Sequence, residues 1–94
     1  MADISVTSSQ RENGWTFGVQ VAELDGQTRH SVTLSLDDFK RLTVGKQTTP
    51  EQLIRKSFEF LLEREPKHHI LRQFDLPAIT RFFPDYPVQI LSRL

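Results

Sequence analysis

The residues best suited to chemistry in this chain are its histidines, two of which, His68 and His69, are adjacent. Histidine ligands on a helix normally stand at positions i and i+4, so that both imidazoles face one metal ion. Adjacent side chains diverge, and Glu65 and Asp75 would complete a site only through an unusual loop geometry. We therefore expect His68 and His69 to form a polar turn, and we predict no metal and no other cofactor.

Nucleophilic and phosphate chemistry are not indicated either. The sequence has no cysteine, and no serine or threonine is placed with a histidine and a carboxylate as a catalytic triad requires. Gly45 and Lys46 lack the glycine pattern of a phosphate-binding loop. His30 is the last candidate base, and we expect it to cap the rim of the core and to hydrogen-bond Glu23. The sequence thus predicts a protein that is not an enzyme.

The charge balance argues against two further classes of partner. Twelve basic residues match twelve acidic ones, and the isoelectric point is near 6.8. Proteins that hold nucleic acid or anionic membranes usually carry a basic excess, so neither partner is expected. No apolar run approaches the roughly 20 residues that span a bilayer, and no secretion signal is visible. The expectation is a single soluble domain over residues 1–94, located in the cytoplasm.

Two hairpins define the expected sheet. Asn13-Gly14 and Asp25-Gly26 favour two-residue type I′ turns, and each dipeptide lies between runs of alternating apolar residues. Such turns place Trp15 opposite Glu12 on one side and opposite Leu36 on the other. Both registers gather apolar residues on one face, whereas a slip by one residue would reverse a whole strand. The predicted core face holds Ile4, Val6, Trp15, Phe17, Val19, Val21, Val32, Leu34 and Leu36.

Helices are expected after the sheet. The segment Ser35-Leu36-Asp37-Asp38 is typical of a helix start, and we expect a short helix from Asp37 to about Val44 that Gly45 closes. Thr49 is the expected N-cap of a long amphipathic helix that begins at Pro50 and runs to Glu65, where Pro66 ends it. The apolar arc of the long helix is roughly 200° wide, more than one sheet face covers. The aromatic C-terminal segment, residues 69–94, is expected to supply the second cover. The predicted fold class is therefore α+β: a three-stranded antiparallel meander, a short helix, a long helix and a C-terminal helical and aromatic segment packed on one sheet face.

One part of the chain resembles a DNA-binding family. The relevant segments are Ser31-Val32-Thr33-Leu34-Ser35-Leu36, Asp37-Asp38-Phe39 and Pro50-Glu51-Gln52-Leu53-Ile54-Arg55. Their order resembles the ribbon-helix-helix family, in which the paired strands of a dimer read the major groove. That resemblance implies a nucleic-acid-binding regulator. The chain departs from the pattern because the first helix is too short, because two further strands belong to the same sheet, and because Arg29 is the one basic residue on the strand.

The C-terminal half is similar to short bacterial proteins of unknown function. The segments that carry this similarity are Ser57-Phe58-Glu59-Phe60-Leu61-Leu62-Glu63-Arg64-Glu65, Phe74-Asp75-Leu76 and Arg81-Phe82-Phe83-Pro84-Asp85-Tyr86. The resemblance implies no activity, cofactor or residue role.

The main functional hypothesis is a small non-catalytic protein-interaction or regulatory module. A three-stranded meander has two open edges, and edge strands readily pair with another chain, so we expect a homodimer or a partner strand at a sheet edge. The candidate partner contacts are Arg29, Ser31 and Thr33 on the third strand, and Phe82, Phe83 and Tyr86 as aromatic anchors beside prolines. The interpretation that we favour for these three aromatic rings is, however, that they cover the long helix.

Overall fold

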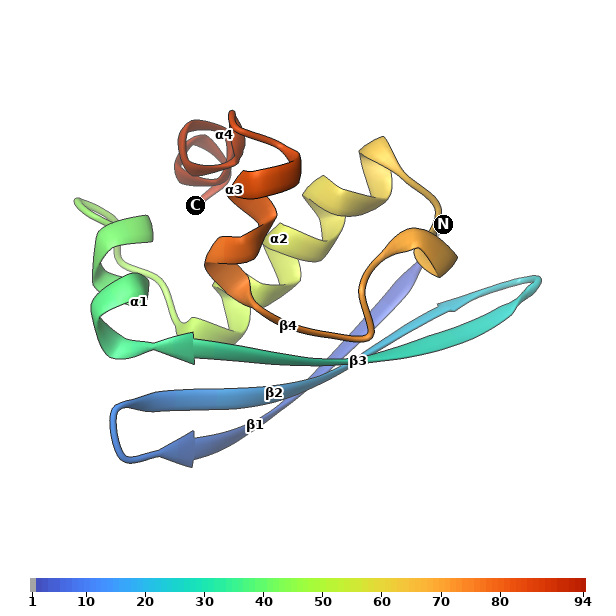
Figure 1. Ribbon diagram of the computed structural model, residues 1–94, viewed down its shortest axis with the longest axis horizontal. Helices are drawn as coiled ribbons and strands as arrows, with labels where there is room; N and C mark the ends of the chain where they lie inside the picture. Colours follow the sequence, from blue (N-terminus) through green and yellow to red (C-terminus); the bar gives the residue numbers. More distant parts are fainter. Residues whose placement is uncertain (1) are drawn as a thin grey trace.

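The predicted meander forms the base of the molecule. The computed structural model describes residues 2–94 (Figure 1). The antiparallel strands are β1 (Asp3–Arg11), β2 (Gly14–Glu23) and β3 (Gly26–Ser35), and two helices follow, α1 (Leu36–Leu42) and α2 (Pro50–Arg64). The C-terminal third contains η1 (Lys67–His69), β4 (Gln73–Asp75), η2 (Leu76–Ala78), α3 (Ile79–Phe82) and α4 (Tyr86–Arg93). The α+β fold class is confirmed.

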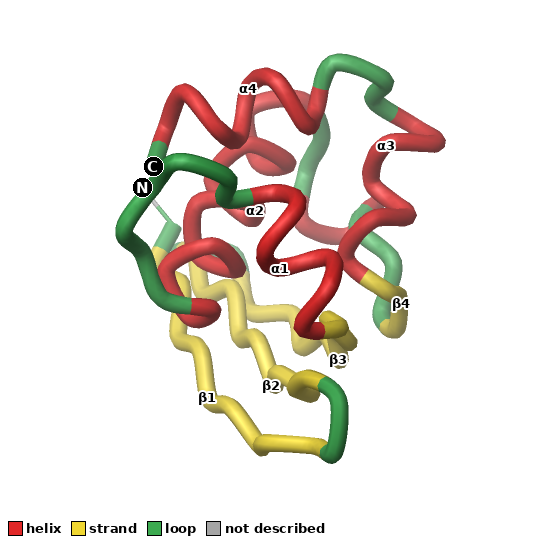
Figure 2. Tube along the Cα trace, turned by 90° about the vertical axis from the view of Figure 1, so that its left-hand side faces the viewer, coloured by secondary structure: helices red, strands yellow, loops and turns green. Residues whose placement is uncertain are grey.

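All the helices lie on the same side of the sheet (Figures 1 and 2). The long helix α2 is buried between the sheet and the C-terminal segment, and its buried residues are Leu53, Ile54, Ser57, Phe58, Phe60 and Leu61. On its far side the ring of Phe60 lies 5.4 Å from that of Tyr86 in α4, measured between centroids. The wide apolar arc is therefore covered from two sides, as predicted. None of the helices within residues 2–94 is long and apolar enough to cross a bilayer.

Side-chain caps determine where the two main helices begin. The Ser35 hydroxyl accepts a hydrogen bond of 3.1 Å from the Asp38 amide, and the Thr49 hydroxyl accepts one of 3.1 Å from the Gln52 amide. Each cap satisfies a backbone donor that the first turn of a helix leaves without a partner. Gly45 follows α1 with a φ of 78°, a conformation that favours glycine and ends helices.

Both hairpin turns lie one residue earlier than predicted. The turn residues are Glu12-Asn13 and Leu24-Asp25, whereas Gly14 and Gly26 begin the outgoing strands. No residue other than glycine has a positive φ in the described part of the chain. A type I′ turn needs positive φ at both central residues, so the predicted turn type is wrong. The glycines carry the unusual conformation instead, with φ values of 155° and 134°.

The earlier turns shift every predicted pairing by two residues. Trp15 lies opposite Gln10 and Leu34, not opposite Glu12 and Leu36. Because side chains alternate along a strand, a shift of two returns each side chain to its predicted face. The predicted core face is thus confirmed except at Leu36, which begins α1 and is 42% exposed.

A fourth strand was not predicted. β4 pairs in parallel with the centre of β3, where the Ser31 amide donates a 2.7 Å hydrogen bond to the Arg72 carbonyl. The Thr33 hydroxyl donates another, also 2.7 Å long, to the Asp75 carboxylate. The strand order is β1-β2-β3-β4, so the expectation of two open meander edges is wrong at β3. β1 is the edge strand that no fourth strand covers, although the Arg55 guanidinium of α2 occupies its Ile4 carbonyl.

Candidate functional site

The contacts predicted on β3 lie on the sheet face opposite the helices. Arg29 and Thr33 are exposed there, and Ser31 is half-buried. Ser31 and Thr33 already bond to the segment that contains β4. The structure therefore brings these residues together on one strand, but it gives two of them partners within the chain.

The three predicted aromatic anchors differ in how deeply they are buried. Tyr86 is fully buried, and its hydroxyl lies 2.6 Å from the Ser57 hydroxyl on α2. Burial raises the pKa of the Tyr86 phenol well above its ordinary value, although the bond to Ser57 opposes that shift. Phe83 is half-buried and meets Phe60 edge to face at 5.9 Å. Tyr86 and Phe83 thus cover α2, as the favoured interpretation predicts, and Tyr86 is a core residue, not a partner contact. Phe82 is 63% exposed.

The histidines are placed differently from one another. His30 is buried, with one ring nitrogen 2.8 Å from the Thr28 hydroxyl and the other 2.7 Å from the Leu71 carbonyl. The expected bond to Glu23 is wrong, because Glu23 pairs with Lys67 at 3.0 Å. Within residues 2–94 no three acidic, histidine or cysteine side chains are grouped as metal ligands.

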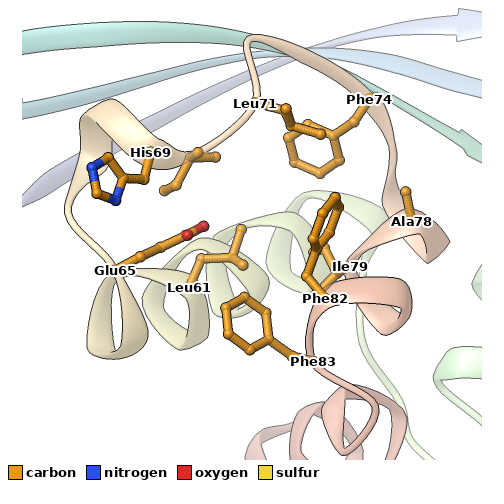
Figure 3. A pocket seen from close by; sticks show the side chains of 10 residues that line it. Leu61, Glu65, His69, Leu71, Phe74, Ala78, Ile79, Phe82 and Phe83 are labelled. Atoms are coloured by element: carbon orange, nitrogen blue, oxygen red, sulfur yellow. The ribbon is translucent and has the colours of Figure 1, made fainter.

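Phe82 stands at the mouth of an apolar cavity of about 160 Å³ between the end of α2, the segment around β4 and α3 (Figure 3). Its floor consists of the buried side chains of Leu61, Ile70 and Ile79. Its walls are the rings of Phe74, Phe82 and Phe83, with Leu71 at the rim. We call this cavity the Phe82 pocket.

The charged side of the Phe82 pocket is formed by Glu65 and His69. Glu65 ends α2 as its C-cap residue, and His69 belongs to the next turn of chain. Burial raises the pKa of the Glu65 carboxyl above its ordinary value, an effect that His69 opposes. The sequence did not predict this pocket, because its lining comes from several separate segments. The one signal in the sequence was Phe82 beside Phe83-Pro84, which is typical of an exposed aromatic anchor.

The second candidate surface is the open edge of β1. The Ile4 carbonyl accepts a hydrogen bond from the Arg55 guanidinium of α2, so this carbonyl points away from β2. Backbone groups alternate along an antiparallel strand, so those of Val6, Ser8 and Gln10 point the same way. The strand carries no charged side chain between Asp3 and Arg11. This edge therefore offers a row of backbone donors and acceptors. The charges that stand near it, Arg55 at Ile4 and Glu51 at Ser8, come from α2 and not from the strand itself.

No protein-family model, no curated protein and no solved structure shows significant similarity to the chain.

Proposed function

We propose that the protein is a non-catalytic interaction module that forms a homodimer by antiparallel pairing of β1 with β1 of a second copy. The observation that carries the proposal is the nine-residue edge of β1, which no other strand covers and whose own side chains are uncharged at the centre. Edge strands without guarding charges, proline or a bulge are ready templates for strand addition. β3 offers a poorer surface, because β4 occupies its central residues.

The charges at the ends of β1 favour self-pairing in one register. If Thr7 lies on the two-fold axis, Asp3 of each copy stands opposite Arg11 of the other, and Ser5 stands opposite Ser9. Opposite charges that face each other across antiparallel strands stabilise the pair. A two-fold axis repeats each contact, as expected for a closed dimer.

The same register places residues of the second copy beside the half-buried apolar border of the sheet. Ile4 and Val6 are half-buried at the border of the core, and pairing would place Val6 opposite Ser8 of the second copy and Ile4 opposite Gln10. Their backbone groups are those that point away from β2, so these pairs would exchange the new hydrogen bonds. The Ile4 carbonyl would have to leave its present donor, the Arg55 guanidinium, to do so. Thr7 would then form a pair without mutual hydrogen bonds at the axis, where side chains approach most closely.

A single cysteine tests this arrangement, because the chain contains none of its own. Cα atoms in a pair without hydrogen bonds lie about 4.5 Å apart, within the range of a disulfide. Thr7→Cys should therefore give a disulfide-linked dimer in dilute solution under mild oxidation, measured by non-reducing gel and mass spectrometry.

Ser5→Cys is the matched control, because it lies on the same face of the same strand. In the proposed register its two copies are roughly 13 Å apart, too far for a disulfide. Cross-linking of Thr7→Cys without Ser5→Cys supports the dimer and its register. Absence of a Thr7→Cys dimer, or equal cross-linking of both variants, would overturn the proposal.

The ribbon-helix-helix alternative finds less support. In that family the reading strand pairs with its own copy. Here the corresponding strand, β3, lies between β2 and β4. Arg29 is exposed on it, but the chain as a whole has no basic excess.

A further inference from the structure

The Phe82 pocket has the size and lining of a site for one small ring. Its volume is about 160 Å³. An apolar cavity of about 150 Å³ is large enough to bind benzene. The floor is aliphatic and buried, the walls include three phenylalanine rings, and the mouth is bordered by exposed Leu71 and Phe82. A ligand with an apolar ring would therefore be covered on several sides.

The Glu65 carboxylate gives the pocket its charge. Figure 3 shows this carboxylate directed toward the cavity, whereas the His69 ring lies on the outer side. Within residues 2–94, the carboxylate takes part in no hydrogen bond or ion pair with another side chain. A partly desolvated carboxylate that lacks a cation favours a positively charged ligand group.

The cations nearest in sequence to Glu65 are already paired elsewhere. The Arg64 guanidinium binds the Asp85 carboxylate at 2.7 Å and stands 4.2 Å above the centre of the Phe60 ring. The Lys67 ammonium lies 2.6 Å from the Asp25 carboxylate and also contacts Glu23. His69, whose ring lies on the outer side of the cavity, is then the remaining titratable neighbour of Glu65.

The aromatic walls favour the same charge. The face of an aromatic ring is electronegative and attracts ammonium groups within about 6 Å. The Phe83 ring already has the Arg64 guanidinium 5.5 Å from its centre. Figure 3 shows the Phe82 ring nearly edge-on, with one face turned toward the side where Glu65 lies.

We propose that the Phe82 pocket binds a small arylalkylammonium compound, with its ring between Phe74 and Phe82 and its charged nitrogen at the Glu65 carboxylate. The ring accounts for the apolar volume, and the ammonium group supplies the cation that Glu65 lacks. This site lies on the helical side of the molecule, so it does not depend on the pairing of β1 (Figure 1).

A charge series of ring compounds tests the proposal with the unmodified chain. ¹⁵N-labelled protein is titrated with benzylammonium, benzyl alcohol and benzoate at pH 7.5, and amide shifts are followed by NMR. Benzylammonium should shift the amides of the pocket residues and bind at least about tenfold more tightly than benzyl alcohol, because a charge-assisted contact is added. Benzoate should bind more weakly than either.

Two variants test whether the Glu65 carboxylate is the charge that selects the ammonium ligand. Glu65→Gln should abolish the preference for benzylammonium over benzyl alcohol while the neutral compound still binds. Glu59→Gln removes the same charge from α2 beside Lys56 and should leave the preference intact. Similar affinity for all three compounds, shifts confined to other surfaces, or no binding would overturn the proposal. Equal binding of butylammonium would overturn the aromatic part and point to a lysine side chain as the occupant.

Discussion

At the scale of single residues, Gly14 determines how the first hairpin closes. Its φ is 155°, and a Cβ atom there would lie 2.1 Å from the Leu34 carbonyl oxygen. Gly26 occupies the corresponding place in the second hairpin with a φ of 134°, but nothing stands within 4 Å of an added Cβ. Gly26→Ala should therefore cost about 1–3 kcal/mol of unfolding free energy through backbone strain alone.

Gly14→Ala should cost more, by about 1–3 kcal/mol, because the carbonyl of β3 must also move. Urea unfolding of both variants measures the difference. Equal losses would show that the close approach of β3 to Gly14 does not matter for stability.

His30 should make stability depend on pH. Burial lowers the pKa of its imidazole below the ordinary 6.5, although the hydrogen bond to the Leu71 carbonyl opposes this shift. Below pH 6.5 the unfolded chain therefore binds a proton that the folded chain resists, so the unfolding free energy falls as the pH falls. The slope from this residue is at most about 1.4 kcal/mol per pH unit.

Urea unfolding at pH 7.5 and pH 5.5 measures this effect. His30→Gln should remove most of the difference between the two pH values, whereas His68→Gln, at an exposed position, should keep it. A difference that survives in His30→Gln would assign the pH dependence to other groups.

At the scale of elements, the helices and strands with a strong local sequence pattern were the ones that the sequence predicted best. The helix-start patterns at Ser35 and Thr49 and the alternation in β1–β3 are local signals. They predicted the helix starts to within one residue and, apart from Leu36, the sheet faces. The registers were wrong by two residues because alternation does not distinguish even shifts. β4 has three residues, too few for a periodic signal, and it forms because the chain returns beside β3.

The position of β4 changes which proline substitution tests strand pairing. Thr33 lies in the ladder with β4, so Thr33→Pro should destabilise the fold itself. The Ser8 amide points away from β2, so Ser8→Pro removes no hydrogen bond within the sheet, and only the side-chain bond to Glu51 is lost. Ser8→Pro should therefore abolish dimerisation while the far-ultraviolet circular dichroism stays that of the parent. A dimer that persists in Ser8→Pro, measured by sedimentation equilibrium, would exclude β1 as the contact.

At the scale of the whole molecule, the two candidate surfaces lie on different parts of the fold. β1 is one edge of the sheet. The Phe82 pocket lies at the C-terminal end of α2, between the segment around β4 and α3 (Figures 1 and 3). The sequence could point to each surface only in part. It indicated a pairing edge and an exposed Phe82, but Tyr86 was misassigned because an aromatic residue between two prolines fits a core position and a surface anchor equally well.

The symmetry of the proposed dimer gives a prediction that a non-symmetric contact does not share. Arg11→Asp would place two like-charged pairs in the interface, because each Asp3 then faces an aspartate of the other copy. Exposed ion pairs contribute roughly 0.2–1 kcal/mol each, so dimerisation should weaken by about tenfold. Asp3→Arg alone should weaken dimerisation similarly, because it sets arginine against Arg11.

Asp3→Arg combined with Arg11→Asp in one chain restores both ion pairs across the two-fold axis. The dissociation constant of this double variant, measured by sedimentation equilibrium at low salt, should return close to that of the parent. Additive weakening in the double variant would exclude the register centred on Thr7, since only that register brings positions 3 and 11 of different copies together.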